Sequence, residues 1–545
     1  MKASCFAKLL MLEMKKANPS FVRSAVILPV LLALVHWTRA APPPPDLDAL
    51  AERVRKEFHI PGLAIAIVKD GQRVVEKGYG VRRMNESEAV DVRTLFNIAS
   101  NTKAFTAAAL SLLVEEGRLH WDDPVTKHLP GFQMHDAWVT REMTVRDLLT
   151  HRSGLGLGAG DLLFWPPTTF TREEIVFRQR FIKAATSFRS HYAYDNCLYI
   201  VAGQIVQAAS GKTWDEFVRE RLLQPLRMTN SSINRDPLAS VMNKAASHVE
   251  VGERLEIVDY ANAENLGPAG GINSCAADMA SWVLALLGAG EKRDGGSTAK
   301  RILNRRRVQE MWSSQTPIPV EDPGPKRAAA KPNFAAYGLG FALRDYRGHK
   351  LVWHSGGLPG QISRVTLAPD LRLGIVLLSN KEPNQGLEAL TYHILDFYLQ
   401  AADTDWIGAY RKAADEKQTK AAETMTVLNE KRAKDTKPSL PLDKYAGSYL
   451  DAWYGEVTIR LEDGKLVLHF TRTPALAGEL EHWQHDSFVA HWRDRSLQAD
   501  AFVYFALKPD GTIDSMKMAA VSPLTDFSFD FQDLNFMPAA KSASR

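Results

Sequence analysis

The spacing of apolar and polar residues divides the chain into segments with different expected structures. Residues 47–58 have the pattern of a helix, and the apolar run at 62–68, followed by an Asp-Gly turn, predicts the first strand of a hairpin. Further apolar runs at 365–367 and 373–378 predict a return to sheet after a long stretch in which helices and strands mix. We therefore expect residues 47–400 to form one α+β or α/β domain whose sheet takes strands from both ends of the segment.

The pattern changes after residue 400. Residues 401–441 are highly charged and helical in composition over 413–437, and two prolines, Pro438 and Pro441, follow. Because proline disfavours continuation of a helix, this composition predicts a helical linker that ends near a domain boundary.

Short alternating runs then predict a second domain made only of strands. Asp-Gly turns at 463–464 and 510–511 separate runs in which every second residue is apolar, and the phenylalanines alternate again from Phe527 to Phe531. This pattern is typical of a small β-sandwich or β-barrel. We assign it to residues 442–537 and treat residues 538–545 as a tail.

The N-terminus has the pattern of a targeting segment. Basic residues ending at Arg23 precede an apolar run at 24–37, and Thr38-Arg39-Ala40 offers small residues at the −3 and −1 positions of a cleavage site. The run is shorter than the roughly 20 residues that a membrane span needs. We predict a cleaved export signal over residues 1–40, with translation starting at Met1 or at Met14. A retained membrane anchor is the alternative, and the prolines of 41–46 form a spacer.

Charge and cysteine content narrow the possible partners. The 545-residue chain has a net charge of +4, from 67 basic and 63 acidic residues, which gives no electrostatic footprint for nucleic acid. The cysteines, Cys5, Cys197 and Cys275, are too few for a disulfide framework, and no Cys/His cluster has zinc spacing. We expect no metal or organic cofactor. A pairing of Cys197 with Cys275 and the oligomeric state stay open.

Ser100 and Lys103 form a Ser-x-x-Lys motif at the start of an Ala/Leu-rich run with high helix propensity. Ser100 is therefore expected at a helix N-terminus, with Lys103 one turn later on the same face. The free N–H groups of a helix N-terminus favour developing negative charge, and the lysine can activate the hydroxyl or relay its proton. Taken alone, the motif fits a simple helix cap and a solvated lysine at least as well.

Tyr194-Asp195-Asn196 precedes an apolar helical run at 198–206, which places it on a loop that enters a helix. A tyrosinate or polarised tyrosine beside a lysine can act as general base and then as general acid. Asn196 can position a substrate amide or carbonyl. The simpler alternative is a tyrosine packed at a turn with Asn196 as a helix cap.

His354-Ser355-Gly356-Gly357 follows an apolar run and is expected at the end of a strand. Two glycines let a substrate approach the backbone closely, so the Gly357 N–H can pair with the Ser100 N–H as an oxyanion site. His354 is expected to hydrogen-bond the Tyr194 hydroxyl or the substrate. The simpler alternative is a turn with an exposed histidine.

The three motifs in this order resemble those of the serine β-lactamase and penicillin-binding-protein superfamily. Within it they are similar to the class C β-lactamase-related branch, which includes esterases and D-aminopeptidases. The segments 144–155 and 268–278 resemble two secondary signatures of the same branch. The resemblance covers residues 47–399 and implies an α+β domain with an antiparallel sheet flanked by helices and an all-helical region. The C-terminal segment resembles the small β-domain appended to some of these hydrolases.

The resemblance implies roles at the matching positions. Ser100 is the expected nucleophile, Lys103 its activator and Tyr194 the acid/base, with Asn196 and the 354–357 segment in substrate and oxyanion binding. His354 stands where class C β-lactamases carry a lysine, which suits a substrate carboxylate less because a histidine is mostly neutral at pH 7.

From these roles we expect an exported serine hydrolase acting on small esters, on D-amino-acid peptides or amides, or on cell-wall fragments. A β-lactamase, a penicillin-binding sensor that is acylated without turnover, and a catalytically silent scaffold are the alternatives.

Overall fold

The structure is a computed structural model that describes residues 40–233, 241–252, 254–258, 264–288, 302–382 and 384–539. Residues 43–545 belong to one structural unit. The predicted signal peptide lies outside the described residues except for Ala40, and so does the predicted tail beyond residue 539. None of the described helices is long and apolar enough to cross a membrane.

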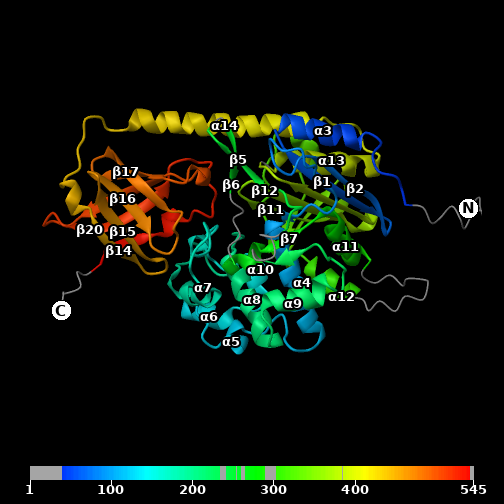
Figure 1. Cartoon of the computed structure of the whole chain (residues 1–545). Helices are drawn as coiled ribbons and strands as arrows, with labels where there is room; N and C mark the ends of the chain where they lie inside the picture. Colours follow the sequence, from blue (N-terminus) through cyan, green and yellow to red (C-terminus); the bar gives the residue numbers. More distant parts are fainter. Residues whose placement is uncertain are drawn as a thin grey trace, which may run out of the picture. The chain divides into compact units, whose positions relative to one another are not determined.

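An eight-stranded antiparallel sheet forms the centre of the first domain (Figure 1). Its order is β2-β1-β13-β12-β11-β10-β9-β8, so β1 (Gly62–Lys69) pairs with β13 (Leu373–Ser379). The expectation that the sheet takes strands from both ends of the segment is therefore confirmed, and the domain is α+β. The other strands are β2 (Gln72–Gly80), β8 (Thr316–Pro317), β9 (Ala335–Tyr337), β10 (Ala342–Tyr346), β11 (His349–Leu358) and β12 (Gln361–Ala368).

Helices cover both faces of this sheet because its central strands are apolar on both sides. Along β1, Leu63, Ile65 and Ile67 enter one core and the alternate residues enter the other. The first core is closed by α3 (Leu47–Glu57), α13 (Gln385–Leu399) and the start of α14 (Trp406–Lys431). The second is closed by the helical region and by α11: α4 (Thr102–Glu115), α5 (Val125–His128), α6 (Ala137–Glu142), α7 (Arg172–Arg178), α8 (Cys197–Ser210), α9 (Trp214–Val218), α10 (Gly267–Gly270), α11 (Ala276–Leu287) and α12 (Arg305–Met311).

The linker helix α14 begins at Trp406, before the charged segment 413–437 that the composition marks as helical. Asp405 caps its N-terminus by accepting the Gly408 N–H, and Trp406 is buried against Tyr392 of α13. Beyond its last turn, Arg432 donates to the Trp483 carbonyl of the second domain. The linker therefore contacts both domains (Figure 1).

The second domain is a closed eight-stranded barrel, which decides between the sandwich and barrel alternatives. Its strands are β14 (Gly447–Asp451), β15 (Gly455–Glu462), β16 (Lys465–Phe470), β17 (Ala477–Gln484), β18 (Ser487–Trp492), β19 (Ala501–Leu507), β20 (Ile513–Ala520) and β21 (Asn535–Pro538). Both predicted Asp-Gly turns lie between neighbouring strands, in β15–β16 and β19–β20.

The strand expected at 527–531 is wrong. This segment belongs to the connection between β20 and β21, which we call the barrel loop (residues 521–534). The Asp526 carboxylate accepts the Ser528 N–H, a local turn bond that competes with strand pairing. Phe529 and Phe531 are buried, whereas Phe527 packs edge-on against Tyr194 of the first domain. The alternating phenylalanines therefore belong to a loop, from which two side chains are buried and one packs against the first domain.

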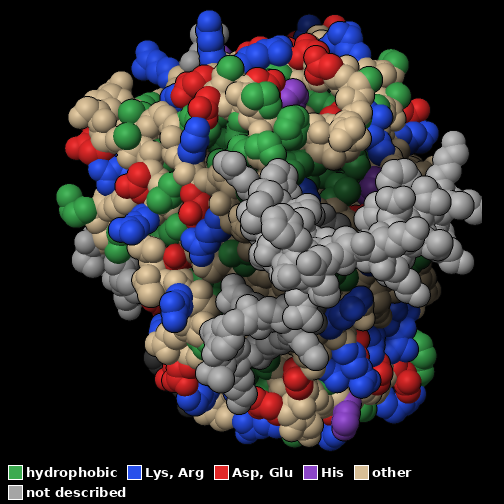
Figure 2. All heavy atoms as spheres, turned by 90° about the vertical axis from the view of Figure 1, so that its right-hand side faces the viewer, with side chains coloured by type: hydrophobic (Ala, Val, Ile, Leu, Met, Phe, Trp, Pro, Cys, Tyr) green, Lys and Arg blue, Asp and Glu red, His purple; other side chains and the backbone are tan. Residues whose placement is uncertain are grey.

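Charged side chains are spread over the surface. On the face shown in Figure 2, acidic and basic side chains are interspersed where the described residues are visible. Many form exposed pairs within one helix, such as Arg53–Glu57 and Lys412–Glu416. Exposed pairs contribute only about 0–1 kcal/mol each, so the stability of the fold rests on its apolar cores.

Candidate active site

Ser100 lies in a single helical turn, η2 (Ala99–Asn101), that leads directly into α4. Lys103 occupies the first turn of α4 and is completely buried, so the alternative of a solvated lysine is wrong. Its Nζ donates to Ser100 Oγ at 3.1 Å, to Asn196 Oδ1 at 2.6 Å and to the Ala269 carbonyl at 3.0 Å. The motif therefore brings a hydroxyl and an amine into direct contact inside the protein.

The environment of Lys103 weakens its hold on a proton. Burial lowers the pKa of Lys103 to about 7, although the nearby Asp161 and Asp195 act in the opposite direction. Its Nζ also lies 4.8 Å from the centre of the Tyr194 ring and 5.3 Å from that of Tyr199. Near pH 7 the neutral and protonated forms are therefore both populated, as a group that takes up and returns a proton requires.

Tyr194 approaches Ser100 from the loop ahead of α8, and the Ser100 hydroxyl acts to lower the pKa of the Tyr194 phenol. Burial raises the pKa of Tyr194 well above its ordinary value. The resting side chain is therefore a neutral phenol, not the tyrosinate that the sequence left open, and it can donate a proton. The His151 ring lies against it at a tilt of 34°, with ring centres 4.3 Å apart, and its Nδ1 accepts the Asp195 N–H at 3.0 Å, which fixes the loop.

Asn196 occupies the position before α8, but its side chain does not cap the helix. Asp195 performs that task by accepting the Leu198 N–H at 3.0 Å. The Asn196 amide instead accepts from Lys103 and donates from Nδ2 to Asp161 Oδ2 at 2.8 Å. Its orientation is thus set by a cationic donor on one side and a carboxyl acceptor on the other.

The motif 354–357 lies at the end of a strand, as expected, and β11 continues through both glycines to Leu358, so the alternative of a turn is wrong. Gly356 is needed for a close approach between elements. A Cβ at this position would lie 2.1 Å from the Ile98 carbonyl oxygen and 2.9 Å from the Ser100 nitrogen. β10 pairs with β11 only as far as Trp353, whereas β12 pairs with β11 through Leu358, and the η2 turn packs against both β11 and β12.

His354 is buried and makes different contacts from those expected. Its Nδ1 donates to the Ser355 carbonyl at 2.5 Å, so Nε2 accepts from the Tyr337 hydroxyl at 2.8 Å. Its partner is therefore Tyr337, a residue that no sequence motif marked, and not the expected Tyr194. The other expected partner, the substrate, stays a prediction. Burial lowers the pKa of His354 to about 3, with the charge of Lys103 adding to the effect, so this histidine is neutral.

These residues line a cavity of about 650 Å³. Ser100, Tyr194, Asn196, His354, Ser355 and Gly357 face it, whereas Gly356 is used in packing. Aromatic side chains form part of its walls, and the charged residues among those described are Glu382, Asp526 and Lys417. The barrel supplies part of the lining through 496–498 and 524–529. The sequence did not signal this contribution, because residues 527–531 have the pattern of a strand.

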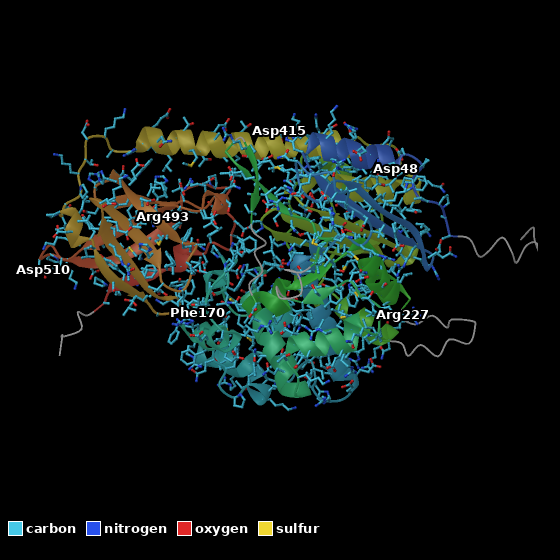
Figure 3. The ribbon with its side chains drawn as sticks, viewed as in Figure 1. Asp48, Phe170, Arg227, Asp415, Arg493 and Asp510 are labelled. Carbon is cyan, nitrogen blue, oxygen red and sulfur yellow. The ribbon has the colours of Figure 1, made fainter. Side chains whose placement is uncertain are left out.

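A separate contact holds the barrel against the helical region. Arg472 of the barrel pairs with Glu174 of α7 at 2.9 Å and lies 4.1 Å above the centre of the Phe170 ring. Tyr454 packs edge-on against the same phenylalanine. Figure 3 labels Phe170 on the part of the helical region that borders the barrel. The barrel is therefore fixed at more than one point.

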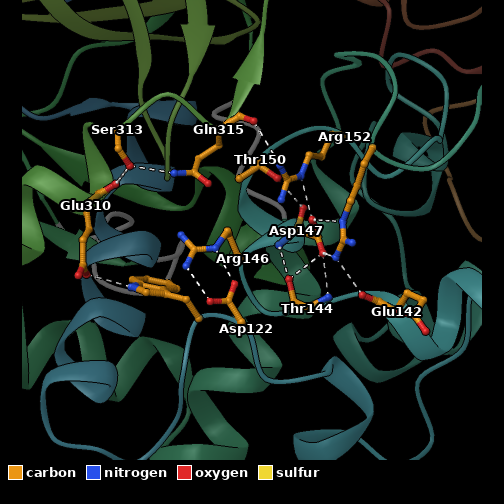
Figure 4. Close-up of polar contacts among 12 residues, drawn as sticks. Asp122, Glu142, Thr144, Arg146, Asp147, Thr150, Arg152, Glu310, Ser313 and Gln315 are labelled. Atoms are coloured by element: carbon orange, nitrogen blue, oxygen red, sulfur yellow. Dashed lines mark hydrogen bonds and ion pairs between the residues drawn. The ribbon is translucent and has the colours of Figure 1, made fainter.

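Polar contacts of the segment 144–155 centre on Asp147 (Figure 4). Asp147 is fully buried and accepts from Thr144 and Arg152, and from Arg189 of the loop that leads to Tyr194. Although burial acts to raise it, the pKa of Asp147 is lowered because these donors favour its carboxylate. Asp147 therefore ties the loop that carries His151 to the loop that carries Tyr194, a role that the sequence did not reveal.

Among the described residues, no group of His, Cys, Asp or Glu side chains has the arrangement of a metal site. Cys197 and Cys275 are both buried free thiols, so the pairing left open by the sequence is not formed.

Comparison with known proteins gives matches over both domains. Residues 47–399 match the family described as beta-lactamase, and residues 431–538 match a domain of unknown function, DUF3471. The chain is 30% identical to unguisins hydrolase ungD′ of Aspergillus campestris, over 86% of this chain and 88% of that protein. It is 27% identical to protein flp of Staphylococcus aureus, over 62% of each.

Solved structures with the same fold include the octameric penicillin-binding protein homologue of Pyrococcus abyssi. This structure has a TM-score of 0.57 at 22% identity and covers 90% of this chain and 99% of that one. SurE has a TM-score of 0.52 at 21% identity, over 91% and 99% of the two chains. At these identities the likeness concerns the fold.

Proposed function

The chain belongs to the beta-lactamase family of serine hydrolases, and we propose that it hydrolyses small esters or amides through an acyl-Ser100 intermediate. The observation that carries the proposal is the contact of 3.1 Å between Ser100 Oγ and the Nζ of buried Lys103, whose pKa is lowered to about 7, because Ser100 lines the cavity. A buried amine of this kind is a base at neutral pH.

In the proposed reaction, neutral Lys103 takes the Ser100 proton as Oγ attacks the substrate carbonyl carbon. The N–H groups of Ser100 and Gly357 receive the oxyanion. Tyr194 passes its phenolic proton to the leaving alcohol or amine and recovers one from Lys103. Water then attacks the acyl ester by the reverse route, and the acid is released with Ser100 restored.

The lining of the cavity favours substrates without a free carboxylate near the nucleophile. His354 is neutral, and the described lining contains one basic residue, Lys417, beside Asp526 and Glu382, whose pKa burial raises to about 7. A fixed cation at the His354 position would suit a β-lactam or a D-Ala terminus better. We therefore place esters and neutral peptides or amides, including those with D-residues, ahead of penicillins, and cell-wall fragments remain within this class.

The test mixes the protein separately with a p-nitrophenyl ester, a fluorescent penicillin and a D-Ala-D-Ala peptide, and measures intact mass and product. Ser100→Ala is compared with Ser111→Ala, a buried serine on the same helix α4 that lies outside the cavity lining. We expect turnover of the ester that Ser100→Ala abolishes and Ser111→Ala retains. A lasting penicillin adduct without turnover would favour a sensor. Folded protein that reacts with none of the three would favour a silent scaffold.

We also propose export, on the basis of the N-terminal sequence. The basic residues ahead of the apolar run and the small residues before Ala41 are those of a cleavable signal. N-terminal sequencing of the protein isolated from its host tests the proposal: a mature N-terminus at Ala41 is expected. Retention of residues 15–40 in a membrane fraction would indicate an anchor instead.

A further inference from the structure

A line of buried hydrogen bonds leads from the catalytic lysine to the barrel. Lys103 donates to Asn196, the Asn196 amide donates to Asp161, and Ser528 of the barrel loop donates to the same Asp161 oxygen at 2.9 Å. Lys103 and Asp161 are completely buried, and Asn196 and Ser528 are 7% and 9% exposed. This line is not part of the Ser-Lys-Tyr set from which the function was argued.

The barrel loop holds the Asp161 turn at three places. Ser528 donates to Asp161, Asp530 accepts the Gly160 N–H at 2.6 Å, and Phe527 covers Gly158. Gly158 has a positive φ of 71°, and a Cβ there would lie 2.7 Å from the Phe527 ring. The turn is thus shaped to receive the loop. Burial raises the pKa of Asp530 to about 10, so its carboxyl is protonated and adds no charge at pH 7.

Asp161 is more than a packing residue, because its Oδ2 accepts both hydrogen bonds and its Oδ1 has no hydrogen-bond partner among the described residues. A buried carboxyl with an unmatched oxygen costs stability, so a position in a core would favour an apolar or amide side chain. Its one evident use is to hold the Asn196 amide with the oxygen turned toward Lys103.

We propose that Asp161, held by Ser528 of the barrel, is a positioning residue that orients Asn196 and sets the charge state of Lys103. The C-terminal barrel then forms part of the proton-transfer machinery and not only a wall of the cavity. This inference rests on the proposed function, since it concerns the amine that activates Ser100.

The charged groups around Lys103 and Asp161 decide whether a substitution raises or lowers the pKa of Lys103. The titratable side chains around Lys103 are Asp161, Asp195, Tyr194, His151 and His354. Those around Asp161 are Lys103, Asp195, Asp530, Tyr194 and Cys197. Among the nearby charges, Asp161 is the largest influence that raises the pKa of Lys103, and burial alone outweighs it. Burial likewise raises the pKa of Asp161, while Asn196, Ser528 and Lys103 favour its ionised form.

Replacing Asp161, which acts to raise the pKa of Lys103, should therefore make Lys103 lose its proton at lower pH. Asp161→Asn keeps the shape and an acceptor oxygen but not the charge. Ser528→Ala removes one hydrogen-bond donor to Asp161, so Asp161 is less readily ionised. The pKa of Lys103 should then fall as in Asp161→Asn, but by less. Ser515→Ala is the matched control, because this serine lies on barrel strand β20, paired with Ala506 and outside the cavity lining.

The experiment measures the rate at which a fluorophosphonate labels Ser100 between pH 5 and pH 9, by intact mass, in the full chain. Ser100 Oγ bonds to phosphorus, fluoride leaves, and the serine proton passes through Lys103 to water. We expect the midpoint of the rising limb to fall by roughly 1 pH unit in Asp161→Asn, by less in Ser528→Ala, and not at all in Ser515→Ala.

The outcomes separate the two proposals. Labelling of Ser100 with superimposable pH profiles in the parent protein and both variants would overturn the role of Asp161 and leave the proposed function intact. Absence of Ser100 labelling at every pH in folded parent protein would overturn both. A shift toward higher pH in Asp161→Asn would also contradict the inference, since the sign would be that of a lost positive charge.

Discussion

At the scale of single residues, the site depends on what burial does to one lysine. Lys103 makes three hydrogen bonds, which favour the ammonium form, yet removal from water lowers its pKa to about 7. His354 is moved in the same direction, to about 3, and so stays neutral throughout the physiological range. Their surroundings therefore give the two bases different roles. Lys103 exchanges a proton, and neutral His354 accepts a hydrogen bond from the Tyr337 hydroxyl.

The first prediction concerns pH. The rate of Ser100 acylation by a p-nitrophenyl ester should rise with pH about a midpoint near 7, because only neutral Lys103 accepts the serine proton. In Lys103→Met the rate should no longer rise with pH about this midpoint, and it should be about 10²–10⁴-fold lower. His354→Asn serves as the control and should leave the midpoint in place, since His354 does not titrate between pH 5 and pH 9. A midpoint near 10 would mean that Lys103 behaves as an exposed lysine.

At the scale of elements, the site is made where strand β11 passes the turn ahead of α4. The strand carries two glycines for different reasons. Gly356 admits the Ile98 carbonyl, which leaves no room for a side chain, whereas at Gly357 a Cβ would meet only the end of Ile362 at 3.2 Å.

This difference leads to the second prediction. Gly356→Ala should lower the melting temperature and slow Ser100 acylation, because backbone must move and overpacking typically costs about 1–3 kcal/mol. Gly357→Ala keeps its N–H and needs only a rotation of Ile362, so its effect on melting should be smaller. Differential scanning calorimetry of the two variants makes the comparison. Equal melting temperatures would show that the turn and the strand are less tightly packed than the structure indicates.

The barrel loop is the second element that decides the site, and it leads to the third prediction. Phe527 lines the cavity and packs edge-on against Tyr194 with ring centres 5.9 Å apart. Phe527→Ala should enlarge the cavity and raise kcat/KM for long acyl chains relative to short ones. A series of p-nitrophenyl esters from acetate to octanoate measures the ratio. Leu461→Ala, at an exposed barrel residue, should leave the ratio unchanged. A ratio in Phe527→Ala equal to that of the parent protein would exclude the barrel loop from substrate selection.

At the scale of the whole molecule, the two domains act as one because the barrel contacts the site and is also fixed elsewhere. Arg472 pairs with Glu174, Arg178 donates to the Trp453 carbonyl, and α14 contacts both domains. The apolar core of the helical region is continuous with that of the barrel. Docking of the barrel is therefore a condition for a complete cavity.

The fourth prediction tests this docking. Arg472→Glu and Glu174→Arg should each expose the linker after α14 and speed its cleavage by trypsin roughly two- to fivefold, because a partly exposed ion pair contributes about 1 kcal/mol or less. The double variant, with the charges exchanged, should be cleaved at nearly the parent rate. Arg493→Glu is the control, because among the described residues Arg493 forms its ion pairs within the barrel, with Glu462 and Glu479. Failure of the exchange to restore resistance would mean that this pair does not hold the domains together.

By itself, the sequence determined the elements that depend on local pattern. The α+β character, the positions of the first and last strands along the chain and the all-β second domain follow from apolar periodicity and from Asp-Gly turns, because neighbouring residues decide both. The chemistry near Ser100 was also visible, since a serine and a lysine one turn apart at a helix start must lie close together.

Only the tertiary structure decided the features that depend on distant residues. The low pKa of Lys103 arises from burial by several segments, the orientation of Asn196 from Asp161, and the partner of His354 from another strand. The barrel loop has a strand-like pattern, yet it packs against the catalytic tyrosine, because contacts with the other domain outweigh local β-propensity. Solvent exclusion and long-range contact are properties of the folded chain, and no local pattern encodes them.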